Sequence, residues 1–174
     1  MKIRRKSLGE MSGYVVDIVP STKWGGFLYA VKIMMTELLT LMTQNVNELP
    51  DWLWYGSAVK AEVSSVRQGD VVKFVVDKLS INEREPSIQP VQISVLSFDA
   101  QSGELTLRMD HGRILTIKVS EGHVKDELLT ASEPDFYALF LDKPSGLKII
   151  SLIRPSKYKI LSRAKELARS LSPP

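Results

Sequence analysis

The chain offers few side chains of the types that catalyse reactions. It has only two histidines, His111 and His123, with no cluster of metal ligands near them in the sequence, and cysteine is absent. A zinc site needs three or four such ligands. The sequence contains no Gly-x-Ser-x-Gly elbow, phosphate-binding loop or dinucleotide-binding glycine pattern. Nothing selects a pair of its carboxylates for acid–base or two-metal chemistry. We therefore expect a protein that is not an enzyme and that uses no metal and no cofactor.

Cations are concentrated at the two ends of the chain. Residues 1–6 carry four Lys or Arg, and residues 147–174 carry seven against a single Glu, although the whole chain has a net charge of only +3. The segment between the two ends is therefore net acidic. Basic ends on an acidic body indicate either a local surface for an anionic partner or solvated termini.

Aromatic side chains gather in two short segments, Trp24–Tyr29 and Trp52–Tyr55. A groove with cations for phosphates and rings for bases holds single-stranded nucleic acid, and each stacked base is worth about 1–3 kcal/mol. Tryptophans also anchor loops to a core, which is the alternative interpretation. The candidate nucleic-acid-binding residues are Lys2, Arg4, Arg5, Lys6, Lys23, Trp24, Trp52, Trp54, Tyr55, Lys73, Arg108, Lys118, Arg154, Lys157, Lys159 and Arg163.

A second hypothesis makes the protein an accessory or scaffolding subunit of a larger ribonucleoprotein, transcription or replication complex. The segment Phe27–Asn47 has a broad apolar surface if it is helical, and such a surface indicates a protein partner or a homodimer. The basic segment at the end of the chain is the other candidate for such a contact. Single-stranded DNA or RNA remains the preferred partner.

The clearest structural signal lies between Val91 and Val119. Apolar and polar residues alternate in three runs, Val91–Val95, Glu104–Met109 and Leu115–Val119, which places the apolar side chains on one face of a strand. The connections Asp99–Gly103 and Asp110–Gly112 have the composition of tight turns. We expect an antiparallel meander with one buried face.

Two helices are expected to pack with this sheet. Apolar residues at three-four spacing predict a long helix over Phe27–Asn47, and Pro50 prevents its continuation. Pro155 and Ser156 open a basic C-terminal helix. Asp51–Val66 fits a helix or a strand, and we favour a short helical turn at the tryptophans.

Further strands are expected at Gly13–Val19, Val71–Ile81, Asp135–Leu141 and Leu147–Ile153, and the last two form a hairpin. The sum is an α+β fold, with an antiparallel or barrel-like sheet of about six or seven strands, a long helix in the N-terminal half and a basic C-terminal helix. We expect residues 1–12 to form a basic arm and residues 13–174 a single domain. No internal repeat is visible.

The composition, 44% hydrophobic and 25% charged residues, is typical of a globular protein. No apolar run approaches the length needed to span a bilayer, and no apolar stretch follows the basic start as it would in a signal peptide. We therefore expect no contact with a membrane and a cytoplasmic location. The lack of Cys and the scarcity of Asn are typical of thermophiles.

Two stretches, Met11-Ser-Gly-Tyr-Val-Val16 and Gly69-Asp-Val-Val-Lys-Phe74, flank the expected long helix. In this order they resemble an uncharacterised family of small archaeal proteins. The resemblance covers the first half of the chain. It implies an archaeal source and no particular activity.

Overall fold

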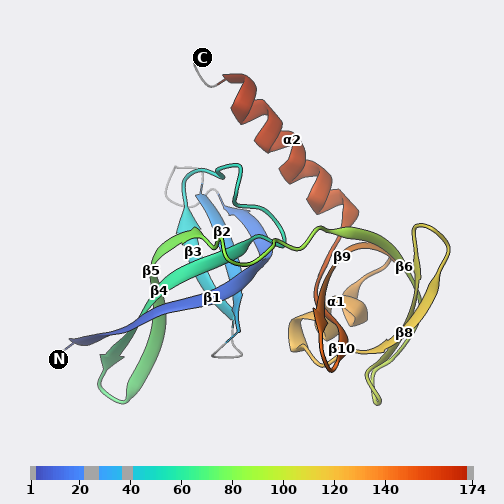
Figure 1. The fold of residues 1–174 in the computed structure, drawn as a ribbon, viewed down its shortest axis with the longest axis horizontal. Coiled ribbons are helices and arrows are strands. Elements are labelled where there is room, and N and C mark those ends of the chain that lie inside the picture. Colours follow the sequence, from blue (N-terminus) through green and yellow to red (C-terminus); the bar gives the residue numbers. More distant parts are fainter. Residues whose placement is uncertain (1–2, 22–27, 37–40, 172–174) are drawn as a thin grey trace. The chain divides into compact units, whose positions relative to one another are not determined.

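The computed structural model describes residues 3–21, 28–36 and 41–171, and most of these residues lie in two antiparallel sheets (Figure 1). The chain divides into two compact units, residues 1–88 (unit 1) and residues 89–174 (unit 2). Unit 1 contains β1 (Ile3–Ser21), β2 (Leu28–Met35), β3 (Leu41–Val46), β4 (Ala58–Gln68) and β5 (Val71–Ile81). Unit 2 contains β6 (Val91–Asp99), β7 (Glu104–Met109), β8 (Ile114–Lys118), α1 (Gly122–Thr130), β9 (Asp135–Lys143), β10 (Gly146–Ile153) and α2 (Pro155–Leu171).

Both units have the same strand order. Unit 1 is ordered β3-β2-β1-β4-β5, and unit 2 is ordered β10-β9-β6-β7-β8, which is the same sequence of strands read from the other edge. In each unit a three-strand meander is followed by a fourth strand that returns to pair with the first, which is the Greek-key arrangement. The third and fifth strands also approach one another, β3 with β5 and β8 with β10. Each sheet is therefore curled into a partly closed barrel.

The core of unit 1 lies between its curled strands. β1 is long enough to pair with β4 along Ile3–Tyr14 and with β2 along Gly13–Ser21. The connection from β3 to β4 contributes Leu53 and Tyr55, both 1% exposed, and the Tyr55 hydroxyl donates a hydrogen bond to the Ile18 carbonyl oxygen at 3.3 Å. The buried strand residues of unit 1 include Val15, Ile18, Val31, Ile33, Val59, Ala61 and Val63.

Unit 2 confirms the predicted meander. β6, β7 and β8 are antiparallel neighbours, and their apolar alternation points into a core to which α1 adds Val124. The predicted hairpin is β9 and β10, and the predicted C-terminal helix is α2. The buried members of this core are Ile93, Leu105, Leu107, Val119, Val124, Phe136, Ala138, Ile149 and Leu152.

The predicted helix over Phe27–Asn47 is wrong, and the α+β class is wrong with it. Most of the described residues of this segment form β2 and β3, and the protein is mostly β. The alternating side chains Val31, Ile33 and Met35 are buried inside the sheet, but Met34 on the opposite side is also only 7% exposed. Because both faces are apolar here, the sequence shows no clean period of two, and a buried strand then resembles a buried helix. The apolar helix face proposed for a partner or a homodimer does not exist.

Two other expectations also differ from the structure. Residues 3–12, the described part of the expected basic arm, belong to β1 of unit 1, and the chain divides into two units where a single domain over residues 13–174 was expected. In the ambiguous Asp51–Val66 segment, the tryptophans lie in turns and the strand β4 begins at Ala58.

Candidate nucleic-acid interface

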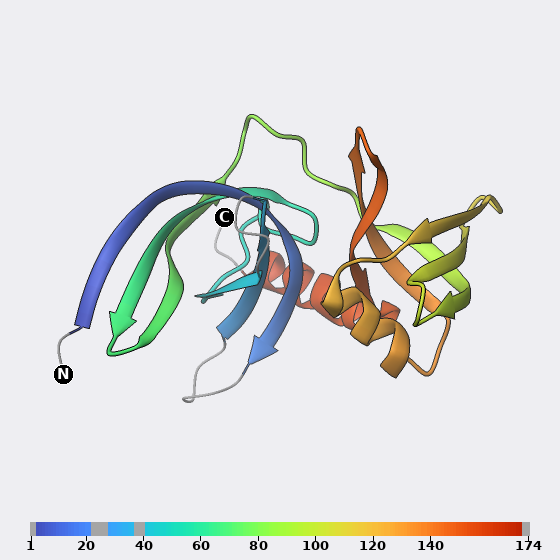
Figure 2. The ribbon, with the colours of Figure 1, turned by 90° about the horizontal axis from the view of Figure 1, so that it is seen from below.

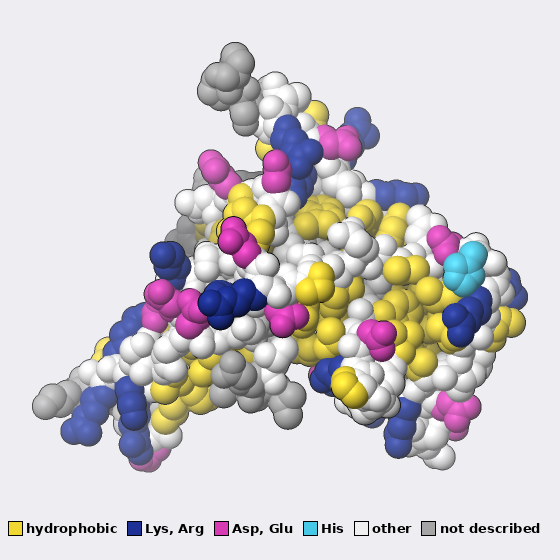
Figure 3. Space-filling model, in the orientation of Figure 1, with side chains coloured by type: hydrophobic (Ala, Val, Ile, Leu, Met, Phe, Trp, Pro, Cys, Tyr) yellow, Lys and Arg dark blue, Asp and Glu magenta, His cyan; other side chains and the backbone are white. Residues whose placement is uncertain are grey.

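The ends of β1, β4 and β5 project from unit 1 as a three-stranded ribbon, defined here as residues 3–8, 64–68 and 71–75 (Figure 2). β2 pairs with β1 only from Gly13 onward, so the ribbon extends beyond β2. In the space-filling view, Lys and Arg side chains gather around these projecting strand ends, with hydrophobic side chains between them (Figure 3). The ribbon carries most of the cations of the predicted basic N-terminus.

The register of the three strands assigns each ribbon side chain to a face. Arg4 pairs with Arg67 and Arg67 with Val72, while Lys6 pairs with Ser65 and Ser65 with Phe74. Directly paired residues in a sheet project to the same side, as do residues two apart on a strand. Three cations, Arg4, Lys6 and Arg67, therefore share one face with Val72 and Phe74. We call this surface the ring face.

The ring face is the extension, beyond the core, of the strand face that is buried in the core of unit 1. Along β5 the exposed fraction rises from 8% at Val76 to 47% at Phe74 and 50% at Val72. Val63, which pairs with Val76, is fully buried. The same alternation that fills the core thus presents an aromatic ring and a valine to solvent, with cations around them.

The opposite face of the ribbon has a different character. Arg5 pairs with Val66, and Val66 pairs with Lys73. Arg5 forms an ion pair with Asp77, and the other carboxylate oxygen of Asp77 accepts a hydrogen bond from the Ser64 hydroxyl. One of the cations on this side is therefore already neutralised by the protein, whereas Lys73 is exposed.

The structure does not bring the predicted aromatic residues to the ribbon. Trp52 and Trp54 are half-buried in the turns before β4, and Tyr55 is buried. The rings of Trp54 and Tyr55 meet edge to face with centroids 5.1 Å apart. The part of β4 that precedes the ribbon, residues 58–63, separates these turns from the ribbon by about 20 Å at 3.3 Å per residue. Burial rules out Tyr55 as a stacking platform; Lys2, Lys23 and Trp24 lie outside the described residues.

The predicted cations of unit 2 fall into different environments. Lys118 on β8 lies directly opposite Glu104. Arg154 forms an ion pair with Glu127 at 3.1 Å and donates to the Thr130 hydroxyl at 3.4 Å, which makes it a structural link between α1 and the start of α2. Lys157 and Arg163 lie along α2.

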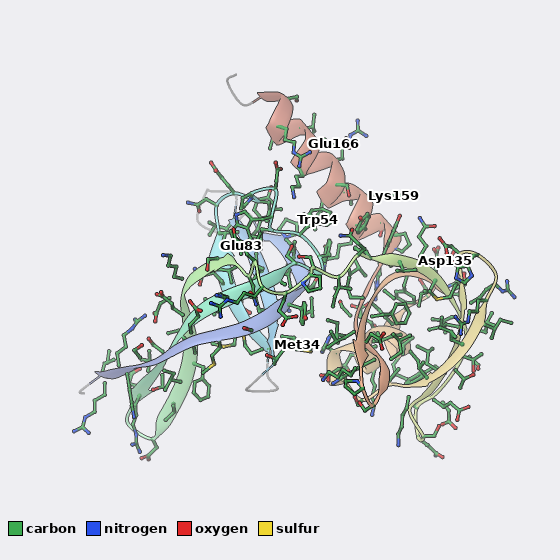
Figure 4. The ribbon with its side chains drawn as sticks, in the orientation of Figure 1. Met34, Trp54, Glu83, Asp135, Lys159 and Glu166 are labelled. Carbon is green, nitrogen blue, oxygen red and sulfur yellow. The ribbon has the colours of Figure 1, made fainter. Side chains whose placement is uncertain are left out.

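Arg108 and Lys159 are brought together by a pocket of about 330 Å³ in unit 2. Its base is the outward face of β6, β7 and β9, and the first turns of α2 form one wall (Figure 4). Lys159 lines it from the helix and Asp135 from β9. The rings of Tyr137 and Tyr158 stack beside it, with centroids 4.0 Å apart and planes inclined by 17°.

The candidate residues predicted from the sequence include Arg4 and Lys6 of the ring face but not Arg67, Val72 or Phe74. The turn between β4 and β5 contains only Gly69 and Asp70, so both strands run for 11 residues, against a common length of about 5–6. The expected strand Val71–Ile81 was already long enough to indicate that part of it lies outside the core.

Five antiparallel strands joined in Greek-key order and curled into a partly closed barrel resemble the architecture of the oligonucleotide-binding type of barrel. The ribbon includes the connection after the fourth strand of unit 1. No protein-family model matches the chain, and no curated protein matches it. Because one fold serves many functions, the ligand must be argued from the side chains.

Two further observations concern the described residues. In residues 3–21, 28–36 and 41–171, no group of three or more His, Asp or Glu side chains is placed to hold a metal ion. Among the helices in these ranges, none is long and apolar enough to cross a membrane.

Proposed function

We propose that the protein binds single-stranded nucleic acid through the ring face of unit 1 and that it is not an enzyme. The observation that supports this most directly is the position of Phe74, exposed on the same face as Arg4, Lys6 and Arg67. The ring supplies a stacking surface for an unpaired base, and the cations supply contacts for the phosphates on either side of it.

The position of the ring face in the fold supports the same ligand. Barrels of the oligonucleotide-binding type use the connection between the fourth and fifth strands in binding, and in unit 1 this connection is the tip of the ribbon. The ribbon is built from three paired strands, so its cations and its ring are held at a fixed spacing before a ligand arrives. A preformed surface of this kind avoids part of the ordering cost of binding. A cytoplasmic location is part of this proposal, because its ligand is found there.

The test is the affinity of the full chain for a fluorescent single-stranded oligonucleotide, measured by anisotropy at several salt concentrations. Phe74→Ala should weaken binding about 5- to 150-fold, the equivalent of 1–3 kcal/mol for one stacked base. The triple variant Arg4→Gln, Lys6→Gln, Arg67→Gln should reduce the magnitude of the salt slope by about 2, since each phosphate contact to a single strand contributes about 0.7.

The ribbon supplies a matched control on its other face. Lys73→Gln removes an exposed cation of the same hairpin without altering the ring face, so its affinity and salt slope should stay close to those of the wild type. Because Phe74 is exposed, thermal unfolding should confirm that Phe74→Ala remains folded. Wild-type affinity in Phe74→Ala, or an equal loss in Lys73→Gln, would contradict the proposal.

A further inference from the structure

The pocket in unit 2 has an ordered lining. Its polar side chains are held in place by one another: the Ser94 hydroxyl donates to Asp135 Oδ1 at 2.5 Å, and Gln92 Nε2 donates to the Tyr137 hydroxyl at 2.9 Å. Tyr137 is in turn held by its stacking contact with Tyr158. A few oriented polar groups in a cavity of about 330 Å³ are typical of a small-ligand site, whose usual range begins near 300 Å³.

Strand register arranges three of these side chains in one row. Arg108 on β7 pairs with Ser94 on β6, and Ser94 pairs with Asp135 on β9. Strands lie about 4.8 Å apart, so the backbones that carry Arg108 and Asp135 are separated by roughly 10 Å across the pocket base. The row presents donors at one end and carboxylate acceptors at the other. Among the described residues, neither Arg108 nor Lys159 has an ion-pair partner.

We infer that this pocket binds a guanine nucleotide, with the base between Arg108 and Asp135 and the phosphate against Lys159. Guanine has two acceptors, O6 and N7, that suit an arginine. On its Watson–Crick edge it also has two neighbouring N–H donors that suit a carboxylate. Adenine, cytosine and uracil lack this pair of adjacent donors. The inference goes beyond the ring face of unit 1 and does not depend on it, since the two sites lie on different units.

The experiment is a calorimetric titration of the full chain with guanosine 5′-monophosphate, adenosine 5′-monophosphate and inosine 5′-monophosphate. The inosine compound differs from the guanosine compound by loss of the 2-amino donor. We expect the guanosine nucleotide to bind about tenfold or more tightly than either of the others. Asp135→Asn, which replaces one acceptor oxygen by a donor, should abolish that preference. Asp142→Asn on the same strand, which lies outside the pocket, should retain it.

A second pair of titrations distinguishes a guanine within a nucleic-acid strand from a free guanine nucleotide. It uses an all-thymine oligonucleotide and the same oligonucleotide with one guanine. A guanine-dependent gain that Asp135→Asn removes and Phe74→Ala keeps shows that the pocket takes guanine from a strand. Preference for the free guanosine nucleotide without such a gain shows that it takes the free nucleotide. Equal affinity for the three mononucleotides, absence of binding, or a preference unchanged in Asp135→Asn would overturn the inference. None of these results depends on whether the ring face binds.

Discussion

Units 1 and 2 share one strand order but use different amounts of strand to build it. The strands of unit 2 are between 5 and 9 residues long, and their alternation ends close to where the core ends. In unit 1, β1 has 19 residues, and β4 and β5 have 11 each. The comparison shows that topology decides which strands pair. Strand length decides how far the alternation of core-facing side chains extends beyond the core, where these side chains are exposed to solvent. The ring face exists because of that excess length.

The two units also cover the end of the barrel in different ways. In unit 2 the connection between the third and fourth strands is α1, which buries Val124. In unit 1 the same connection is a series of turns, and it buries Leu53 and Tyr55. The position in the fold is equivalent and side chains of this connection are buried in both, but the backbone that carries them differs. A helix and a turn can therefore occupy one topological position, provided that each delivers apolar side chains to the core.

The largest expected effect tests whether the two cores are independent. Leu107 is fully buried in unit 2, so Leu107→Ala should lower the unfolding free energy of that unit by about 2–5 kcal/mol. All three tryptophans precede residue 88, so their fluorescence reports on unit 1, whereas circular dichroism reports on both units. In urea, the dichroism should show an earlier transition while the fluorescence midpoint stays unchanged. The exposed Leu147, changed to Ala, is the control; equal shifts in both signals would show a single cooperative core.

Substitution of one glycine in each unit should lower stability by the next largest amount. A side chain at Gly103 of unit 2 would lie 2.8 Å from the Val119 carbonyl oxygen, on a backbone with φ of +77°. A side chain at Gly13 of unit 1 would lie 2.7 Å from the Met34 carbonyl oxygen. Gly103→Ala should cost about 1–2 kcal/mol for the backbone and about 1–3 kcal/mol for crowding, and Gly13→Ala only the second amount.

The same two signals separate these variants. Gly103→Ala should shift the dichroism transition, and Gly13→Ala should shift the tryptophan transition. Gly112, with φ of +93° and open space around it, is the control that isolates the backbone term in unit 2. If Gly112→Ala proves as costly as Gly103→Ala, the close approach to Val119 contributes nothing.

The smallest expected effect is a pH dependence confined to unit 2. Backbone N–H groups of Gln101 and Ser102 donate to Asp99, and these hydrogen bonds lower the pKa of its carboxyl below its ordinary value of 3.8. A lowered pKa in the folded state stabilises the protein above the unfolded value, and this contribution is lost as pH falls through the folded value. Asp99→Asn should therefore reduce the acid sensitivity of the dichroism transition. An unchanged acid dependence would contradict this role.

The amount that could be predicted from the sequence also differs between the units. β6, β7 and β8 each have one face exposed to solvent, so apolar and polar residues alternate clearly in their sequences. Most of the apolar residues predicted to face the core do face it. In β2 both faces are covered, and Met34 on the outer side is as apolar as Ile33 on the inner side. The two-residue alternation that identifies a strand is therefore absent from this part of the sequence. The repeated strand order was not visible at all, because two barrels can share a topology without sharing residues.

The residues of the candidate site could be predicted only in part from the sequence, for a related reason. Arg4 and Lys6 were evident as cations, but a strand pattern does not show which of its neighbours faces them. Arg67 and Phe74 join them only through the pairing of β1 with β4 and of β4 with β5. The pairs between β1 and β4 link residues about 60 positions apart in the sequence. Local periodicity contains no information about such pairs.

The long first strand has a consequence for biosynthesis. Ile3 pairs with Gln68, so the ribbon part of β1 has no partner until about 65 further residues have been made. At ribosomal rates of about 5–20 residues per second, this wait lasts roughly 3–13 s. An unpaired strand is prone to pair with neighbouring chains, and closely spaced positive charges oppose this. We therefore expect Arg4, Arg5 and Lys6 to oppose association of nascent chains until the ribbon has formed.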